Sequence, residues 1–225
     1  IAAATAQAEK NLHNARELFQ SVLQSTFSQK GDDWEETTLG EAYDVRDGTH
    51  DSPKYHSEGH PLLTSKNLKR DGLNYDKVKY ISSEDYGKIN QRSKVDQGDV
   101  LFAMIGTIGN PVVVMCEPDF AIKNMALFKA GEKNSQFLRY YLDSDFVVSK
   151  MASEAKGTTQ RFVGLGYLRK FPISLPNDLT QQAIVKKLDA LSQETKRLEA
   201  IYERKKAALA ELKQSLLQKA FAGEL

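Results

Sequence analysis

The pattern that most constrains this fold is a heptad repeat in the last fifth of the chain. The repeat predicts the seam of a coiled coil, because alternating steps of four and three keep residues on one helix face. A helix over residues 180–222 would be about 65 Å long, too long to bury its seam on one small domain. We therefore expect a partner helix. The apolar seam positions are Ile184, Leu188, Leu191, Leu198, Tyr202, Leu209, Leu212 and Leu216, with the polar Thr195 and Lys205 in the same register.

A second segment, residues 1–28, has the same periodicity and could supply that partner. Its seam predicts a helix that ends near Gly31, a residue that commonly stops helices. We expect the two helices to pair. The predicted seam positions are Ala8, Leu12, Ala15, Phe19, Val22 and Thr26.

The two ends of the chain are also similar in sequence. Residues 17–30 read ELFQSVLQSTFSQK and residues 211–224 read ELKQSLLQKAFAGE, with 7 of 14 positions identical at an offset of 194. Solenoid repeats are much shorter, roughly 20–50 residues. We interpret the chain as one complete unit of a large duplication, preceded by the tail of another unit.

Charge and cysteine content set limits on function. The net charge is +1, and residues 31–178 carry 19 Lys and Arg against 22 Asp and Glu. A nucleic-acid surface in that segment would therefore need local clustering of basic side chains. The lone Cys116 cannot form an internal disulfide, which favours the cytoplasm. We expect this thiol to be buried and structural, because it follows an apolar strand.

The middle of the chain predicts a mixed α/β (α+β) domain. Short apolar runs over 98–105 and 111–115 indicate two buried strands joined by a glycine-containing turn. A third strand is predicted at 126–129, a helix at 135–144 and an extended exit at 171–176. We expect three parts: a helix end at 1–30, a globular domain at 31–178 and a coiled-coil helix at 179–225.

Two patterns could be mistaken for metal sites. His50, His56 and His60 cluster, but their spacing matches no zinc pattern, so we predict a hydrogen-bonding polar loop and no metal. Asp119 with Glu154 and Lys156 matches a loose metal-dependent nuclease template. That template is short enough to occur by chance, and the chain has no serine-hydrolase elbow or phosphate-binding loop. We expect a chain that binds and organises, without a cofactor.

Three polar loops suggest which ligand the chain binds. Lys66-Asn67, Lys123-Asn124 and residues 157–161 combine amides, hydroxyls and cations. Cations and hydroxyls suit phosphate oxygens, while Asn, Gln and Arg can hydrogen-bond to base edges. These loops favour DNA readout.

The whole chain resembles the specificity (DNA-recognition) subunits of type I restriction–modification systems, in particular their C-terminal half. No single motif carries this resemblance, but the combination is specific. The similar stretches are Trp34 to Glu41, Asp47 to Tyr55, Gly59 to Leu68, Gln97 to Leu101, residues 157–160 leading to 171–176, and 181–185 through 216–225.

The resemblance implies a non-catalytic subunit whose second target-recognition domain reads one half of a bipartite double-stranded DNA sequence. The two conserved helices would pair antiparallel as a spacer, and modification (methyltransferase) and restriction (translocase/nuclease) subunits would dock on them. Because a first recognition domain is missing, two copies could pair through their long helices as a homodimer. Residues expected near DNA are Lys66, Asn67, Lys123, Asn124, Thr158, Thr159, Gln160 and Arg161, with Thr49, His50, Lys54 and Tyr55.

Two other functions stay open. The acidic balance of residues 31–178 favours a coiled-coil scaffold whose globular domain binds protein. The nuclease template leaves a metal-dependent nuclease as the weakest alternative.

Overall fold

The computed structural model describes residues 1–157 and 161–224. The chain forms two compact units, one made of residues 1–26 with 186–225 and the other of residues 27–185. Among the described residues, no helix is both long and apolar enough to cross a membrane.

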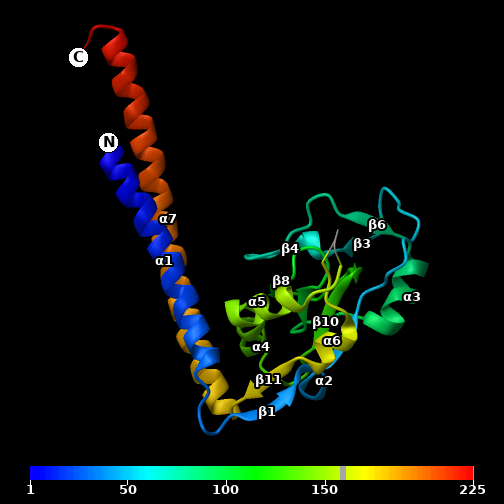
Figure 1. The fold of residues 1–225 in the computed structure, drawn as a ribbon. Helices are drawn as coiled ribbons and strands as arrows, with labels where there is room; N and C mark the ends of the chain where they lie inside the picture. Colours follow the sequence, from blue (N-terminus) through cyan, green and yellow to red (C-terminus); the bar gives the residue numbers. More distant parts are fainter. Residues whose placement is uncertain (158–160, 225) are drawn as a thin grey trace. The chain divides into compact units, whose positions relative to one another are not determined.

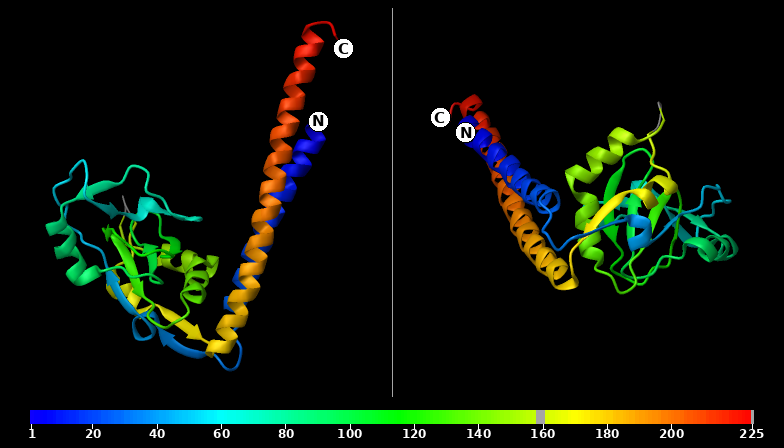
Figure 2. Two further views of the ribbon diagram at one scale, coloured as in Figure 1. Left: turned by 180° about the vertical axis from the view of Figure 1, so that it is seen from behind. Right: turned by 60° about the horizontal axis from the view of Figure 1, so that its bottom comes forward.

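The helical unit is built from α1 (Ala2–Ser28) and most of α7 (Asp178–Phe221), which lie side by side in the views of Figures 1 and 2. Arg16 Nε lies 3.1 Å from Glu199 Oε1, and Lys206 Nζ lies 3.7 Å from Glu9 Oε1. As residue numbers rise along α1, the numbers of the facing residues fall along α7, so the two helices run antiparallel. The predicted antiparallel coiled coil is confirmed.

The buried stripe of the helices departs from the predicted seam in two places. In α1 it continues through Leu23, which is fully buried, and not through Val22, which is half-buried. The cause is the drift of a helix with 3.6 residues per turn against a 3.5-residue repeat. In α7, Leu188 and Thr195 are buried, whereas Leu212 and Leu216 are exposed. The polar Lys205 is exposed as well, and the remaining predicted positions are half-buried: Ile184, Leu191, Leu198, Tyr202 and Leu209.

The exposure of Leu216 follows from the register. Because Glu9 lies opposite Lys206, the first residue of α1 comes level with about Lys213. The last turns of α7 extend past that point, so no described residue of α1 covers them.

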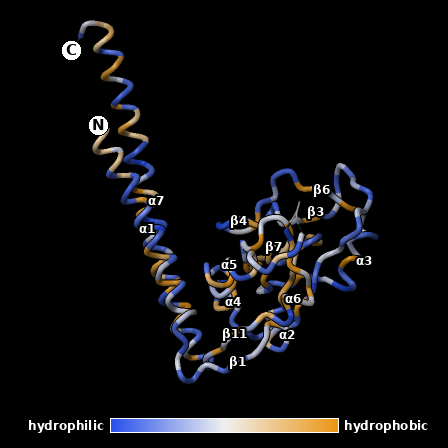
Figure 3. The backbone as a smooth tube through the Cα atoms, viewed as in Figure 1, coloured by the Kyte–Doolittle hydropathy of each residue, from blue (hydrophilic) through white to orange (hydrophobic). Residues whose placement is uncertain are grey.

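The globular unit has a central antiparallel sheet in the order β2-β10-β7-β8. Its register sets Asp47 beside Ala126 and Leu101 beside Leu127. Every residue of β7 is buried, and Figure 3 shows hydrophobic residues concentrated around this strand. The strands are β2 (Asp44–Asp47), β7 (Val100–Ala103), β8 (Gly109–Val113) and β10 (Met125–Lys129).

A smaller mixed sheet in the order β6-β3-β9 lies next to the central sheet in the core. Its strands β3 and β9 are parallel and set Leu62 beside Ala121. Leu63, Ile122 and Leu127 belong to one buried cluster, which joins the two sheets. The elements of this part are β3 (His60–Leu63), the short helix η1 (Ser65–Asn67), β4 (Leu68–Lys69), β5 (Gly72–Leu73), β6 (Lys79–Ile81), α3 (Ser83–Ser93) and β9 (Ala121–Ile122).

The ends of the globular chain meet in an antiparallel pair, β1 (Glu35–Thr38) with β11 (Pro172–Leu175). Thr38 then caps α2 (Leu39–Ala42) through a reciprocal capping box with Glu41. A Cβ on Gly40 would lie 2.8 Å from the carbonyl oxygen of Arg169, so only glycine allows this packing against α6. The remaining helices are α4 (Ser135–Asp143), α5 (Asp145–Glu154) and α6 (Leu165–Lys170).

The predicted strands and helix of the middle region are present with shifted ends, but one prediction there is wrong. Cys116 is exposed, not buried. The sheet pairing ends just before it: Val114 N–H donates to Asp99 O over 2.9 Å, and Met115 is already 70% exposed. An apolar run does not reveal at which residue it leaves the sheet.

Candidate nucleic-acid interface

The candidate site begins where the chain leaves β2 and crosses the segment after β9. A Cβ on Gly48 would lie 2.4 Å from the carbonyl oxygen of Ile122, so a glycine is needed for the two backbones to approach. Thr49 N–H donates to Ile122 O over 3.0 Å, and Asn124 N–H donates to Thr49 O over 3.1 Å. This crossing brings together two predicted site segments that lie more than 70 residues apart in sequence.

The side chains of His50 and Asn124 meet at this crossing. His50 Nδ1 lies 2.8 Å from Asn124 Oδ1, and His50 Nε2 lies 2.9 Å from Asp47 Oδ2. Asn124 has a φ of +54°, a left-handed conformation that asparagine tolerates better than most residues. Asp47 is buried and also receives the guanidinium of Arg92. Its carboxylate therefore has two cationic or potentially cationic partners.

These partners favour the protonated form of His50. Both atoms that face the ring nitrogens are oxygen acceptors, so both nitrogens can donate only when the ring is an imidazolium. The hydrogen bond to Asn124 and then that to Asp47 raise the pKa of His50 above its usual value. The arrangement thus favours a cation at the edge of the crossing.

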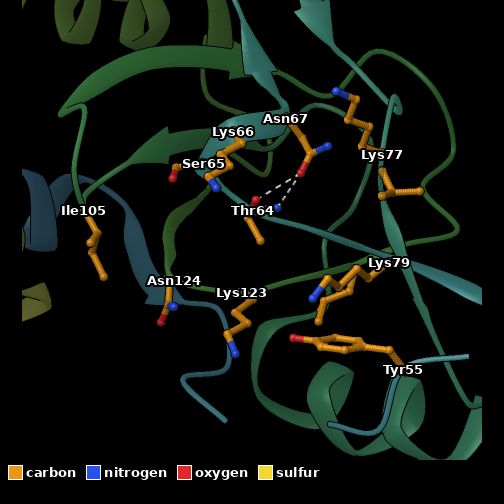
Figure 4. Close-up of a pocket in the computed structure, with 12 residues that line it drawn as sticks. Tyr55, Thr64, Ser65, Lys66, Asn67, Lys77, Lys79, Ile105, Lys123 and Asn124 are labelled. Atoms are coloured by element: carbon orange, nitrogen blue, oxygen red, sulfur yellow. Dashed lines mark hydrogen bonds between the residues drawn. The ribbon is translucent and has the colours of Figure 1, made fainter. Parts of the chain in front are cut away.

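A cavity of about 360 Å³, the lysine recess, lies beside this crossing (Figure 4). Its basic residues are Lys66, Lys77, Lys79 and Lys123, and no Asp or Glu is among the described residues that line it. Tyr55 and Asn124 also line it. The recess is a local concentration of positive charge in a segment whose overall balance is acidic.

The lysines differ in how they are held. Lys123 Nζ donates to Asp51 O over 2.7 Å and to Ser52 Oγ over 2.6 Å, which ties down the loop after His50. Lys79 Nζ lies 4.1 Å from the centre of the Tyr55 ring, a cation–π distance. Lys66 and Lys77 are exposed and make no ion pair within the described part of the chain. Their charges can be directed at an anionic ligand.

Asn67 lines the recess, but its side chain serves the protein itself. The residue is 6% exposed. Its Oδ1 accepts from Thr64 N–H over 2.9 Å and Thr64 Oγ1 over 3.1 Å, and its Nδ2 donates to Asn74 O over 2.8 Å. We therefore correct its expected role from DNA contact to support of the turn that carries Lys66.

A second cavity of about 440 Å³, the apolar recess, adjoins the first. Ile105 lines both. The walls of the apolar recess are Met104, Ile105, Phe162, Gly164 and Leu165, with Asp47 and His50 at its polar edge.

The other predicted DNA residues are less closely associated with these recesses. Lys54 and Arg161 are exposed and line neither recess, and Arg161 Nη1 donates to Ala152 O over 3.3 Å. Thr49 contributes its backbone to the crossing, and its Oγ1 accepts from Asp51 N–H over 3.1 Å. Thr158, Thr159 and Gln160 lie outside the described residues.

A family model decides what kind of domain carries these recesses. The family described as "Type I restriction modification DNA specificity domain" matches residues 31–207. The chain belongs to this family. The family name describes recognition of DNA, not catalysis.

Individual relatives agree with this specificity family. The specificity subunit of type I restriction enzyme EcoBI from Escherichia coli is 27% identical over 138 residues, which are 60% of this chain and 29% of that subunit. A chain from a structure on complex assembly and conformational transition of the type I R-M system has a TM-score of 0.79 at 22% identity, over 98% of this chain and 55% of that one. The HsdS subunit from Thermoanaerobacter tengcongensis has a TM-score of 0.67 at 22% identity, over 98% and 54%.

The two structural likenesses support the mixed fold with its long helices. The chain spans about half the length of these solved chains and 29% of the curated relative.

The sequence prediction missed four residues of this specificity domain: Lys77, Lys79, Ile105 and Phe162. The two lysines are close in the sequence, but Lys77 has a φ of +57° in the turn before β6, so strand alternation does not predict that it shares a face with Lys79. For Ile105 and Phe162 no local signal existed. They meet through an isolated β-bridge between distant segments.

Three residues of the metal and nuclease alternatives, His60, Asp119 and Glu154, are engaged away from the two recesses. His60 Nδ1 lies 2.7 Å from Asp119 Oδ1 and its ring stacks on Tyr86, whereas Glu154 Oε2 accepts from Tyr167 OH over 2.7 Å. Neither carboxylate lines a recess described above. Among the described residues, no group of three or more His, Cys, Asp or Glu side chains is placed to hold a metal ion.

His60 also faces Ser83, with Nε2 3.3 Å from its Oγ. The order Ser83, His60, Asp119 is that of a serine-hydrolase triad. The side chain of Asp119 is 80% exposed, however, whereas the acid of such a triad is buried. We interpret the cluster as a link between β3 and α3.

Proposed function

We propose that residues 31–178 read one half of a bipartite double-stranded DNA target. The observation that carries this proposal is the lysine recess with the His50–Asn124 pair at its edge. Lysine ammonium groups neutralise phosphates and fix the register of a protein on DNA. An asparagine amide beside them can read a base edge. Oδ1 of Asn124 has a second lone pair, so its bond to His50 does not prevent such a contact.

We infer that the paired helices act as a spacer, and that modification (methyltransferase) and restriction (translocase/nuclease) subunits assemble on the chain in the cytoplasm. The chain would supply recognition, and methyl transfer and cleavage would come from those partners. This part rests on the family and on the length of the coiled coil.

The competing function is a scaffold whose globular unit binds protein, which the net charge of −3 over residues 31–178 favours. The salt dependence of DNA affinity separates the two. Phosphate contacts release counterions, so the logarithm of affinity should fall steeply with the logarithm of salt concentration. A flat response would contradict DNA readout.

Single lysine variants locate the contact. We expect Lys66→Gln and Lys77→Gln to weaken binding to all duplexes and to lower the salt slope by about 1 each. Lys213→Gln is the matched control, because Lys213 is exposed on α7 and carries the same charge. If the control lowers the slope as much as the recess variants do, the recess is not the phosphate site.

We also propose that two copies associate through the last turns of α7. Leu212, Leu216, Leu217 and Phe221 are 49%, 37%, 48% and 89% exposed, an apolar stripe that a symmetric partner could cover. Light scattering at high concentration should give a dimer for the chain and a monomer for Leu217→Glu. A chain that stays monomeric at high concentration would contradict this association.

A further inference from the structure

The apolar recess is unusual for a surface that we propose to face DNA. Its walls come from Met104, Ile105, Phe162 and Leu165, and Phe162 is 40% exposed. A single exposed apolar side chain needs no explanation. Here the exposed Phe162 shares one recess with the half-buried Ile105 and Leu165, and Asp47 and His50 are the titratable residues among its described lining. Asp47 is hydrogen-bonded to His50 and ion-paired with Arg92, so its carboxylate would not meet the DNA as an unpaired negative charge.

The backbone holds this wall in place. Phe162 and Lys156 exchange two N–H···O hydrogen bonds of 2.9 Å, and Val163 N–H donates to Met104 O over 3.0 Å. The residue before Phe162 is held as well, because Gly106 N–H donates to Arg161 O over 2.9 Å. The exposed ring of Phe162 therefore sits on a fixed backbone, which lowers the entropic cost of placing it against a ligand.

The apolar recess is continuous with the proposed phosphate site. Ile105 lines both recesses, and His50 of the apolar recess bonds to Asn124 of the lysine recess. We infer that a duplex whose phosphates contact Lys66 and Lys77 would present neighbouring base edges to Ile105 and Phe162.

The chemistry of DNA limits what an apolar wall can read. Of the four base pairs, only those with thymine present an apolar group in the major groove, the C5-methyl. We propose that the apolar recess recognises the 5-methyl group of a pyrimidine in the target half-site, with Phe162 and Ile105 as specificity-determining residues. This inference rests on the proposed function. Thymine and 5-methylcytosine share this group, so the test must separate them.

The test starts from a random duplex pool selected on the full chain, which yields the preferred half-site. Duplexes of that sequence are then made with uracil in place of each thymine in turn, which removes one methyl group and leaves base pairing intact. We expect about a fourfold loss of affinity at one thymine, as burial of one methyl-sized group predicts. Cytosine and 5-methylcytosine are compared at the same position. A gain with 5-methylcytosine alone would show that the recess reads the methyl group and not thymine O4.

Variants assign the effect to the recess. Phe162→Ala should bind thymine and uracil duplexes equally. Phe146→Ala is the matched control, since Phe146 is 42% exposed and lines neither recess, and it should keep the preference. Equal wild-type affinity for thymine and uracil at every position would overturn the inference while leaving DNA recognition intact. A preference that persists in Phe162→Ala would also overturn it. Failure of the wild type to bind any duplex at low salt would instead overturn the proposed function.

Discussion

The imidazole of His50 and the amide of Asn124, 74 residues apart in the chain, lie 2.8 Å from each other between the two recesses. The pair forms because Gly48 lets the chain after β2 pass directly against Ile122. A polar edge of this kind, next to four lysines, is the feature on which we base the proposed DNA contact.

The protonation of His50 should make a pH-dependent contribution to stability. Its pKa is raised in the folded chain by Asn124 and Asp47. The contribution should be complete below the pKa of the unfolded chain, about 6.5, and should disappear as the pH rises through the higher folded-state value. Because the side chain is 55% exposed, we expect no more than about 1 kcal/mol. The unfolding free energies of wild type and His50→Ala, compared at pH 5.5 and at pH 8.5, measure this contribution. A stability difference between the two proteins that is the same at both pH values would refute this account.

The close approach at Gly48 should not tolerate a larger residue. A Cβ would lie 2.4 Å from Ile122 O, and backbone cannot easily move away. We expect Gly48→Ala to cost about 1–3 kcal/mol in unfolding free energy and to weaken DNA binding. Gly87→Ala is the control, because nothing lies within 4 Å of its Cβ and it lies inside α3. Gly87→Ala should raise the unfolding free energy by about 0.5–1 kcal/mol. Loss of stability in both variants would show that crowding at Gly48 is not the cause.

Two phenylalanines at matching positions of the terminal repeat should behave differently. Phe27 is 3% exposed, and its ring centre lies 5.5 Å from those of Phe137 and Tyr141, whereas Phe221 is 89% exposed. We expect Phe27→Ala to lower the unfolding free energy by about 3–5 kcal/mol. Phe221→Ala should change it by less than about 0.5 kcal/mol at concentrations where the chain is monomeric. Denaturant unfolding compares them, and similar losses would mean that Phe221 is buried in the monomer.

The neighbours Lys66 and Asn67 should separate affinity from stability. Asn67→Ala leaves Thr64 and Asn74 without their buried partner, so we expect about 1–3 kcal/mol of destabilisation. Lys66→Ala should unfold like the wild type and bind DNA more weakly. Thermal unfolding and DNA affinity measured on both variants test this. The assignment fails if Asn67→Ala is fully stable but loses discrimination between DNA sequences.

The long helices were predictable because their signal repeats over many turns. The sequence placed helices at 1–28 and 180–222, and the structure has Ala2–Ser28 and Asp178–Phe221. The choice of Leu23 over Val22 was not predictable from a strict heptad, since the buried face drifts around a straight helix. Strand β7 was recognisable as an apolar run, but the exposure of Cys116 depends on where pairing ends.

The candidate site was predictable only in part. Cation–amide pairs such as Lys123-Asn124 were visible locally, and the structure places them at a recess. Which segments meet there depends on long-range pairing, above all the parallel contact of β3 with β9 and the crossing at Gly48. Asn67 fitted the same local pattern, yet its role is set by Asn74, whose carbonyl it reaches only in the folded turn.

The most direct test of the central claim is the genomic methylation pattern of a host that carries the complete operon encoding this chain. The pattern is compared between the native gene and one in which the segment for residues 34–176 is replaced by that of a relative. We predict a bipartite methylated motif of which one half changes while the other half and the spacing stay the same. A motif that is indifferent to the replacement would contradict recognition by this domain and favour the scaffold.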